Sequence, residues 1–173
     1  MDAAQFYKSF EEGFASSILP IGCKRLAGTQ CKWKLAIPDG ALYFSIATNP
    51  KSAGLLDLKL WPGEFRPVFD WQNGKGKWKV VTPLSIFEYA DSSEKQHHSA
   101  LRRQALGKYL QSGGTDQYGT LSQELAALGD QKQRIAGAWC YFVDTLDASE
   151  WGAWHGKMFT NYVRNFIGHA QQV

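Results

Sequence analysis

Residues 31–61, CKWKLAIPDGALYFSIATNPKSAGLLDLKLW, decide the fold class, because apolar and polar residues alternate in three successive runs. In the first run, the apolar positions that share one face are Trp33, Leu35 and Ile37. Strict alternation is typical of strands with one buried face. Pro-Asp-Gly at 38–40 and a later Asn-Pro pair separate the runs and mark turns, because Gly tolerates positive φ and Pro restricts φ. The stretch therefore predicts an antiparallel meander with one apolar face.

The meander extends on both sides of this stretch. Residues 22–27 predict a short strand before it, and an Asn-Gly pair predicts a hairpin between runs at 65–71 and 77–81. Because Pro67 has no N–H to donate, we expect 65–71 to be an edge strand or irregular. The sheet would hold about five strands. Its buried face is expected to contain Trp33, Leu35, Ile37, Leu42, Phe44, Ile46, Leu56, Leu58 and Leu60.

Helical periodicity flanks the strands. Residues 2–19 repeat apolar side chains every three or four positions, with Asp2 and Gln5 spaced as a capping pair. We expect the phenylalanines of this helix to contact the apolar face of the sheet. Four further helices are expected after the strands, at 91–111, 120–128, 130–146 and 147–167. Strands followed by helices indicate an α+β fold, with the C-terminal helices packed on the sheet and residues 1–173 forming one domain.

Composition limits the functional classes. The chain has 173 residues, a net charge of +3 and a pI near 8.7, which is less basic than dedicated nucleic-acid domains. Three cysteines and no export signal favour free thiols and a cytoplasmic location. No apolar run is long enough for a membrane span. Motifs for phosphate-binding loops, hydrolases and zinc proteases are missing, so we expect no catalytic residues, metal or cofactor.

The segment from Trp61 to Trp71 has the strongest functional signal. It places charged side chains among large rings, and Arg66 offers a forked donor for a carboxylate or phosphate. The competing interpretation is a strand whose rings fill the core and whose charges pair at the surface. The candidate binding residues are Trp61, Glu64, Phe65, Arg66, Asp70 and Trp71.

Lysines on the predicted strands offer a second candidate surface. If their side chains share the solvent face, they form a positive stripe suited to phosphates. The members of this stripe would be Lys32, Lys34, Lys77 and Lys79. The modest net charge and the absence of an aromatic RNA-binding motif make nucleic acid the less favoured partner.

These observations favour a non-catalytic cytoplasmic module that binds another protein, as immunity, adaptor and chaperone proteins do. The first alternative is a small-ligand-binding or hydrolytic enzyme that uses residues 61–71. The second is a weak nucleic-acid binder that uses the lysine stripe. The partner and the oligomeric state do not follow from the sequence.

Overall fold

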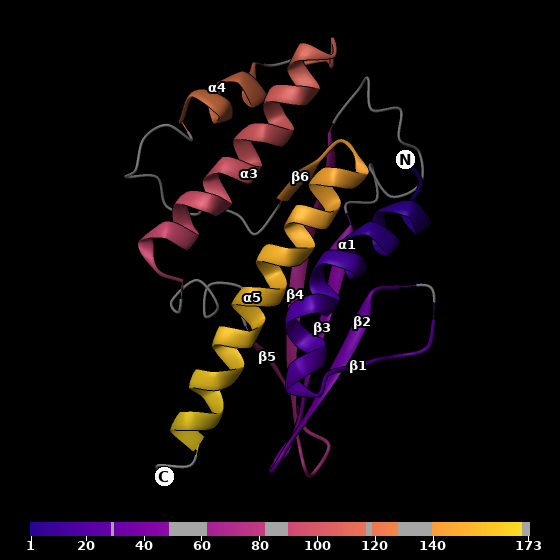
Figure 1. The fold of residues 1–173 in the computed structure, drawn as a ribbon, viewed down its shortest axis with the longest axis vertical. Coiled ribbons are helices and arrows are strands. Elements are labelled where there is room, and N and C mark those ends of the chain that lie inside the picture. The colour runs from indigo at the N-terminus through magenta and orange to yellow at the C-terminus, as the bar shows by residue number, and fades with distance from the viewer. Residues whose placement is uncertain (29, 49–61, 82–89, 117–118, 128–139, 171–173) are drawn as a thin grey trace.

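A computed structural model describes residues 1–28, 30–48, 62–81, 90–116, 119–127 and 140–170 and has an α+β arrangement (Figure 1). The elements in chain order are α1 (Ala3–Ile18), a 3-10 turn (Leu19–Ile21), β1 (Lys24–Arg25), β2 (Lys32–Ile37), β3 (Gly40–Thr48), β4 (Gly63–Asn73), β5 (Trp78–Val81), α3 (Ser92–Gln111), α4 (Thr120–Ala127), β6 (Cys140–Phe142) and α5 (Thr145–Ala170).

The strands form one antiparallel sheet in the order β1-β2-β3-β4-β5, and β6 also pairs with β4. The predicted antiparallel sheet is thus confirmed for β1, β2, β3, β4 and β5, but the expected pairing of the run at 40–48 with the third run is wrong, because β3 pairs with β2 and β4. In the structure β3 pairs directly with β4, from Gly40 opposite Asn73 to Thr48 opposite Phe65. The strand predicted from the third alternating run, with Leu56, Leu58 and Leu60, lies outside the described residues.

The prediction that residues 65–71 form an edge or irregular strand is wrong, because β4 is an inner strand. It pairs with β3 along one side and with both β6 and β5 along the other. On that second side, β6 pairs with residues 63–65 and β5 with residues 69–72. Pro67 lies between these two ladders, at a point where β4 pairs with neither β5 nor β6. Its missing N–H therefore interrupts neither ladder.

The helix α1 forms as the sequence predicts. Asp2 and Gln5 make a reciprocal capping box, and every fourth side chain from Phe6 to Ile18 is buried. Phe14 stacks on Phe44 of β3 with 4.2 Å between ring centroids, and Phe10 lies 6.0 Å from the same ring. The predicted contact between the phenylalanines of this helix and the apolar face of the sheet is therefore confirmed.

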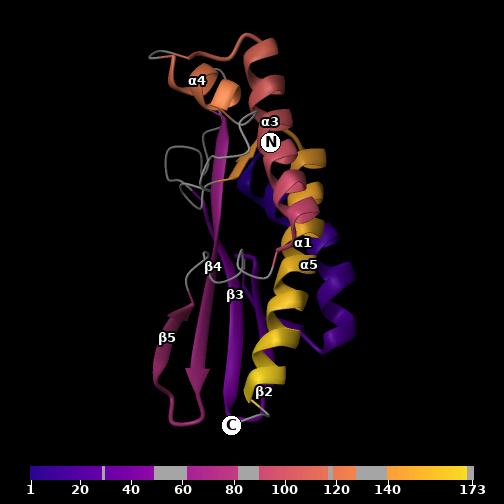
Figure 2. The same cartoon turned by 90° about the vertical axis from the view of Figure 1, so that its left-hand side faces the viewer.

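α1 and α5 lie side by side on the same face of the sheet (Figures 1 and 2). Glycines make this close approach possible. A Cβ added at Gly152 would lie 2.0 Å from the carbonyl oxygen of Phe10, and one added at Gly13 would lie 2.0 Å from that of Ser149. Gly13 lowers the helix propensity of α1, but its missing side chain is what lets α5 pack against the backbone.

Most of the predicted buried face is confirmed. Phe44 is fully buried, and Ile37 is partly buried against the same core. The other buried members of the predicted set are Trp33, Leu35, Leu42 and Ile46. Rings from α5 complete the layer, with Phe159 stacked 5.7 Å from Phe69. The core is thus an aromatic layer between the sheet and the pair α1–α5.

The predicted group of four C-terminal helices is partly wrong. Residues 140–142 of the expected helix 130–146 form strand β6, and its residues 130–139 lie outside the described part of the chain. Of the helices described after the meander, α5 packs on the apolar face, α3 contacts β6 and α4 contacts α3. α5 also begins earlier than predicted, because Asp144 accepts a hydrogen bond from the backbone N–H of Asp147 at 2.9 Å.

Candidate functional site

The segment predicted as a binding site separates onto two faces of β4. Phe65 is fully buried and lies 5.2 Å from the ring of Phe6, on the side covered by α1 and α5. Arg66 is exposed and Asp70 is half-buried, and the alternation of the strand places both on the opposite side. Trp71 packs against the core from its partly buried position. Because Phe65 has no exposed surface, it cannot supply contact area to a partner.

The two remaining residues of the predicted set lie elsewhere. Trp61 is outside the described residues. Glu64 is buried and is opposite Tyr141 in the pairing of β4 with β6. The placement therefore supports the competing interpretation for the rings, while the binding role of Arg66 and Asp70 stays a prediction.

Tyr141 belongs to a buried polar cluster that joins α3, α4 and β6. Its hydroxyl donates to Glu124 at 2.7 Å, and the guanidinium of Arg102 lies over its ring at 5.5 Å. Arg102 also forms an ion pair with Glu124. Burial, followed by the hydrogen bond to Glu124, raises the pKa of the Tyr141 phenol. The cluster fastens α4 to the rest of the molecule, and the sequence analysis missed it because its members are far apart in the chain.

The side of the sheet that faces away from α1 and α5 carries polar and charged residues. In Figure 2 both helices lie on the other side of β3 and β4. The strand pairing places Lys24 of β1 opposite Lys34 of β2, and Lys34 opposite Tyr43 of β3. Tyr43 is in turn opposite Asp70 of β4. These residues therefore form one row across four strands, which we call the Lys24–Asp70 row.

Neighbouring side chains extend this row into a charged face. Lys32 is exposed on the same side of β2, opposite Ser45, and Arg66 is exposed on β4, opposite Ala47. The ammonium group of Lys34 lies 5.5 Å from the centre of the Tyr43 ring. We call this surface the basic face and define it by Lys24, Lys32, Lys34, Tyr43, Arg66 and Asp70.

The predicted lysine stripe is assembled differently from the expectation. Lys32 and Lys34 are on the basic face, but Lys79 is opposite Trp71 in the register, one position away from Asp70 and its row. Lys77 precedes β5, in the turn that Asn73 stabilises. Lys24 takes their place beside Lys34. Sequence reasoning missed this pairing, because a two-residue strand carries too little alternation to fix its register.

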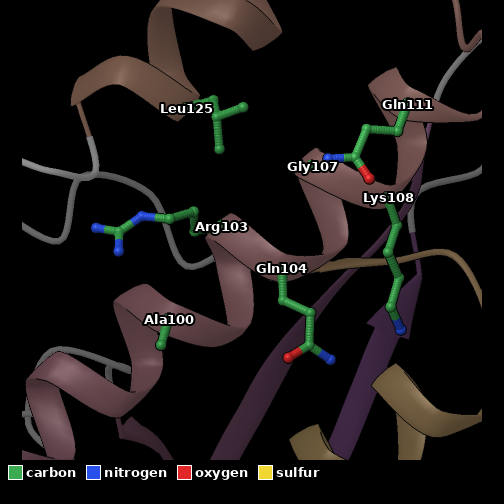
Figure 3. Close-up of a pocket in the computed structure, with 7 residues that line it drawn as sticks. All are labelled: Ala100, Arg103, Gln104, Gly107, Lys108, Gln111 and Leu125. Carbon is green, nitrogen blue, oxygen red and sulfur yellow. The ribbon is translucent and has the colours of Figure 1, made fainter.

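A shallow groove of about 510 Å³ runs along α3 (Figure 3). Leu125 of α4 forms one wall, and Gly107 leaves open space beside the helix. Lys108 and Gln104 line the groove, but both donate to Asp147 at the start of α5, at 2.6 and 3.2 Å. The polar groups of these two side chains thus attach α3 to α5, which gives them a structural role.

The three cysteines and two of the histidines, His98 and His155, are buried. None of the three cysteines forms a disulfide, and burial raises the pKa of Cys23 to about 11 and those of Cys31 and Cys140 further. Burial lowers the pKa of His155 to about 4 and is also the main cause of the lowered pKa of His98. These thiols stay protonated and inert at neutral pH, and the histidines stay uncharged inside the core.

The described residues contain no group of three His, Cys, Asp or Glu side chains placed to hold a metal ion. Within the same residues, every helix is too short or too polar to cross a membrane. Comparison with known proteins adds no family to this description: no family model, curated protein or solved structure matches the chain.

Proposed function

We propose that this protein is a non-catalytic module that binds another protein through the basic face of its sheet. The observation that carries the proposal is the direct pairing of Lys24 with Lys34 across neighbouring strands. Like charges placed opposite each other destabilise a sheet, by up to about 1 kcal/mol. An acidic partner would turn this unfavourable pair into a favourable contact.

The surroundings of the pair support this interpretation. Lys24 and Lys34 take part in none of the ion pairs found among the described residues. Lys32, two positions along β2, adds a third ammonium group about 7 Å away along the strand. On β3, the residues opposite Lys32 and Arg66 are small, Ser45 and Ala47. The result is a surface with more positive than negative charges, which suits contact with an acidic part of a protein.

The alternative functions have weaker support. An enzyme that uses residues 61–71 would need titratable groups in an accessible pocket, but the described residues there are divided between the core and the sheet surface. A nucleic-acid binder would use the same lysines, and the experiments below separate it from a protein binder. Three cysteines without a disulfide agree with a reducing compartment, so we retain the cytoplasm as the proposed location.

The substitution Lys24→Glu tests the proposal with two opposite effects. It replaces a like-charged pair by an attractive one, so the free protein should become more stable by about 0.5–1 kcal/mol. For a chain of this size, the melting temperature should rise by about 2 °C. The same substitution removes a cation from the surface and should release the partner. Gain of stability with loss of binding is typical of a site kept for function.

The binding measurement uses the immobilised protein to capture partners from extracts of its own cells. Lys8→Glu is the matched control, because Lys8 is exposed on α1, away from the basic face. This substitution changes the net charge by the same amount as Lys24→Glu. A protein captured by the wild type and by Lys8→Glu, but lost with Lys24→Glu, supports the proposal. Retention of the same captured proteins by Lys24→Glu would refute it.

A further inference from the structure

Asp70 introduces one negative charge into the basic face. It occupies the fourth place of the Lys24–Asp70 row, opposite Tyr43. Its side chain is half-buried and belongs to none of the ion pairs found among the described residues. Two strand spacings separate it from Lys34, a distance of about 10 Å, so the two charges do not pair directly.

Tyr43 lies between the opposite charges and is already engaged. The ammonium group of Lys34 lies over its ring at 5.5 Å, and its hydroxyl donates to the side-chain oxygen of Gln72 at 3.1 Å. Proteins that bind single-stranded nucleic acid stack bases on available aromatic rings. A ring that holds a cation on one face and is fixed at its hydroxyl is poorly suited to that role.

We propose that the partner contacts the basic face with a mixed segment, in which carboxylates face the lysines of β1 and β2 and one arginine or lysine faces Asp70. This inference rests on the function proposed above and specifies the chemistry of its partner. The charged groups of a nucleic acid are all phosphates, so its backbone would be repelled where it passes Asp70. A protein segment can place a cation at that point and carboxylates about 10 Å away, where Lys34 lies.

The probes are fluorescently labelled peptides of ten residues, rich in glutamate, in which a single arginine is moved along the positions. The same peptide with glutamine in place of arginine and a ten-nucleotide thymidine strand serve as comparisons. At moderate salt, the best arginine peptide should bind the wild type about three- to fivefold more tightly than the glutamine peptide. This difference in affinity is what one exposed ion pair contributes. It should also bind more tightly than the oligonucleotide.

Asp70→Asn tests the role of the carboxylate. This change should abolish the preference for the arginine peptide, because the charge that selects it is gone, while the glutamine peptide binds as before or more tightly. Asp70→Lys should raise the affinity for the oligonucleotide several-fold, since it completes a uniformly positive surface. Melting temperatures of both variants show that the sheet is intact, and Asp70→Asn, which preserves shape, keeps the test valid if Asp70→Lys fails to fold.

The two proposals fail in different ways. If Asp70→Asn leaves the ratio between the two peptides unchanged, or if the wild type binds the oligonucleotide as tightly as the best peptide, the mixed segment is refuted. Lys24→Glu with the same probes tests the surface itself. If that substitution leaves peptide binding unchanged, the basic face is not the binding site, and the function proposed above fails with it.

Discussion

The buried imidazole of His155 should make the stability of this protein depend on pH in the mildly acidic range. His155 lies in α5 and meets the ring of Trp154 edge to face, with 4.9 Å between centroids, and it also contacts the rings of Phe10 and Phe65. Its Nδ1 donates to the carbonyl oxygen of Trp151 at 2.8 Å, which fixes the tautomer. Burial in this aromatic surrounding lowers its pKa to about 4.

The size of the effect follows from proton linkage. In the unfolded chain the imidazole has a pKa of about 6.5, so below that pH the unfolded state binds a proton that the native state does not. Stability is therefore complete above about pH 6.5 and falls as the pH drops towards the native pKa. Between pH 7 and 5, His155 alone should cost about 2 kcal/mol. His98, whose pKa is also lowered, adds to the loss in the same direction.

Urea denaturation at pH 7, 6 and 5 measures this loss. The variant His155→Leu removes the titrating group and should reduce the loss between pH 7 and 5 by about 2 kcal/mol, whatever its stability at pH 7. Met158→Leu is the matched control, because Met158 is buried in the same helix and carries no titrating group, and it should keep the wild-type dependence. Carboxylates titrate mainly below this range. If His155→Leu loses as much stability as the wild type, the buried neutral imidazole is not the cause.

Two further predictions concern packing. Phe44→Ala should cost about 3–5 kcal/mol in urea denaturation, because its fully buried ring touches both α1 and α5; a loss below about 1 kcal/mol would contradict that position. Gly152→Ala should lower stability by about 1–3 kcal/mol, since its Cβ would collide with a carbonyl oxygen of α1. Gly107→Ala, which meets open space in α3, should instead raise stability by about 0.5–1 kcal/mol; equal effects of the two alanines would show that α1 and α5 are not in close contact.

The predictable part of the fold is the part that periodicity controls. β2 and β3 alternate strictly, and α1 carries its phenylalanines at helical spacing, so each was placed correctly from the sequence. β6 was not, because three residues carry too little pattern to separate a strand from the helix expected there. Pro67 led to the wrong prediction of an edge strand for a related reason. Its missing N–H excludes a ladder at one point only, and β4 receives two different neighbours on either side of that point.

The candidate site was less predictable than the fold, because it depends on which strands lie next to each other. The sequence analysis placed Arg66 and Asp70 in one candidate set with Phe65, whereas the alternation along β4 sends Phe65 to the core. Lys24 is recognised only through its position opposite Lys34. Register between strands is set by turns and by tertiary packing, which a single sequence does not display.

The glycine contact between α1 and α5 affects both faces of the sheet. Because Gly13 and Gly152 let the helices approach closely, both fit side by side on the apolar face and bury their aromatic rings there. The basic face is then on the side of the sheet where neither of these helices lies (Figure 2). Its like-charged lysines oppose folding slightly, whereas the aromatic layer stabilises the fold strongly. A chain with this division can keep an unfavourable charge pair, and binding an acidic partner is the function that would explain why it does.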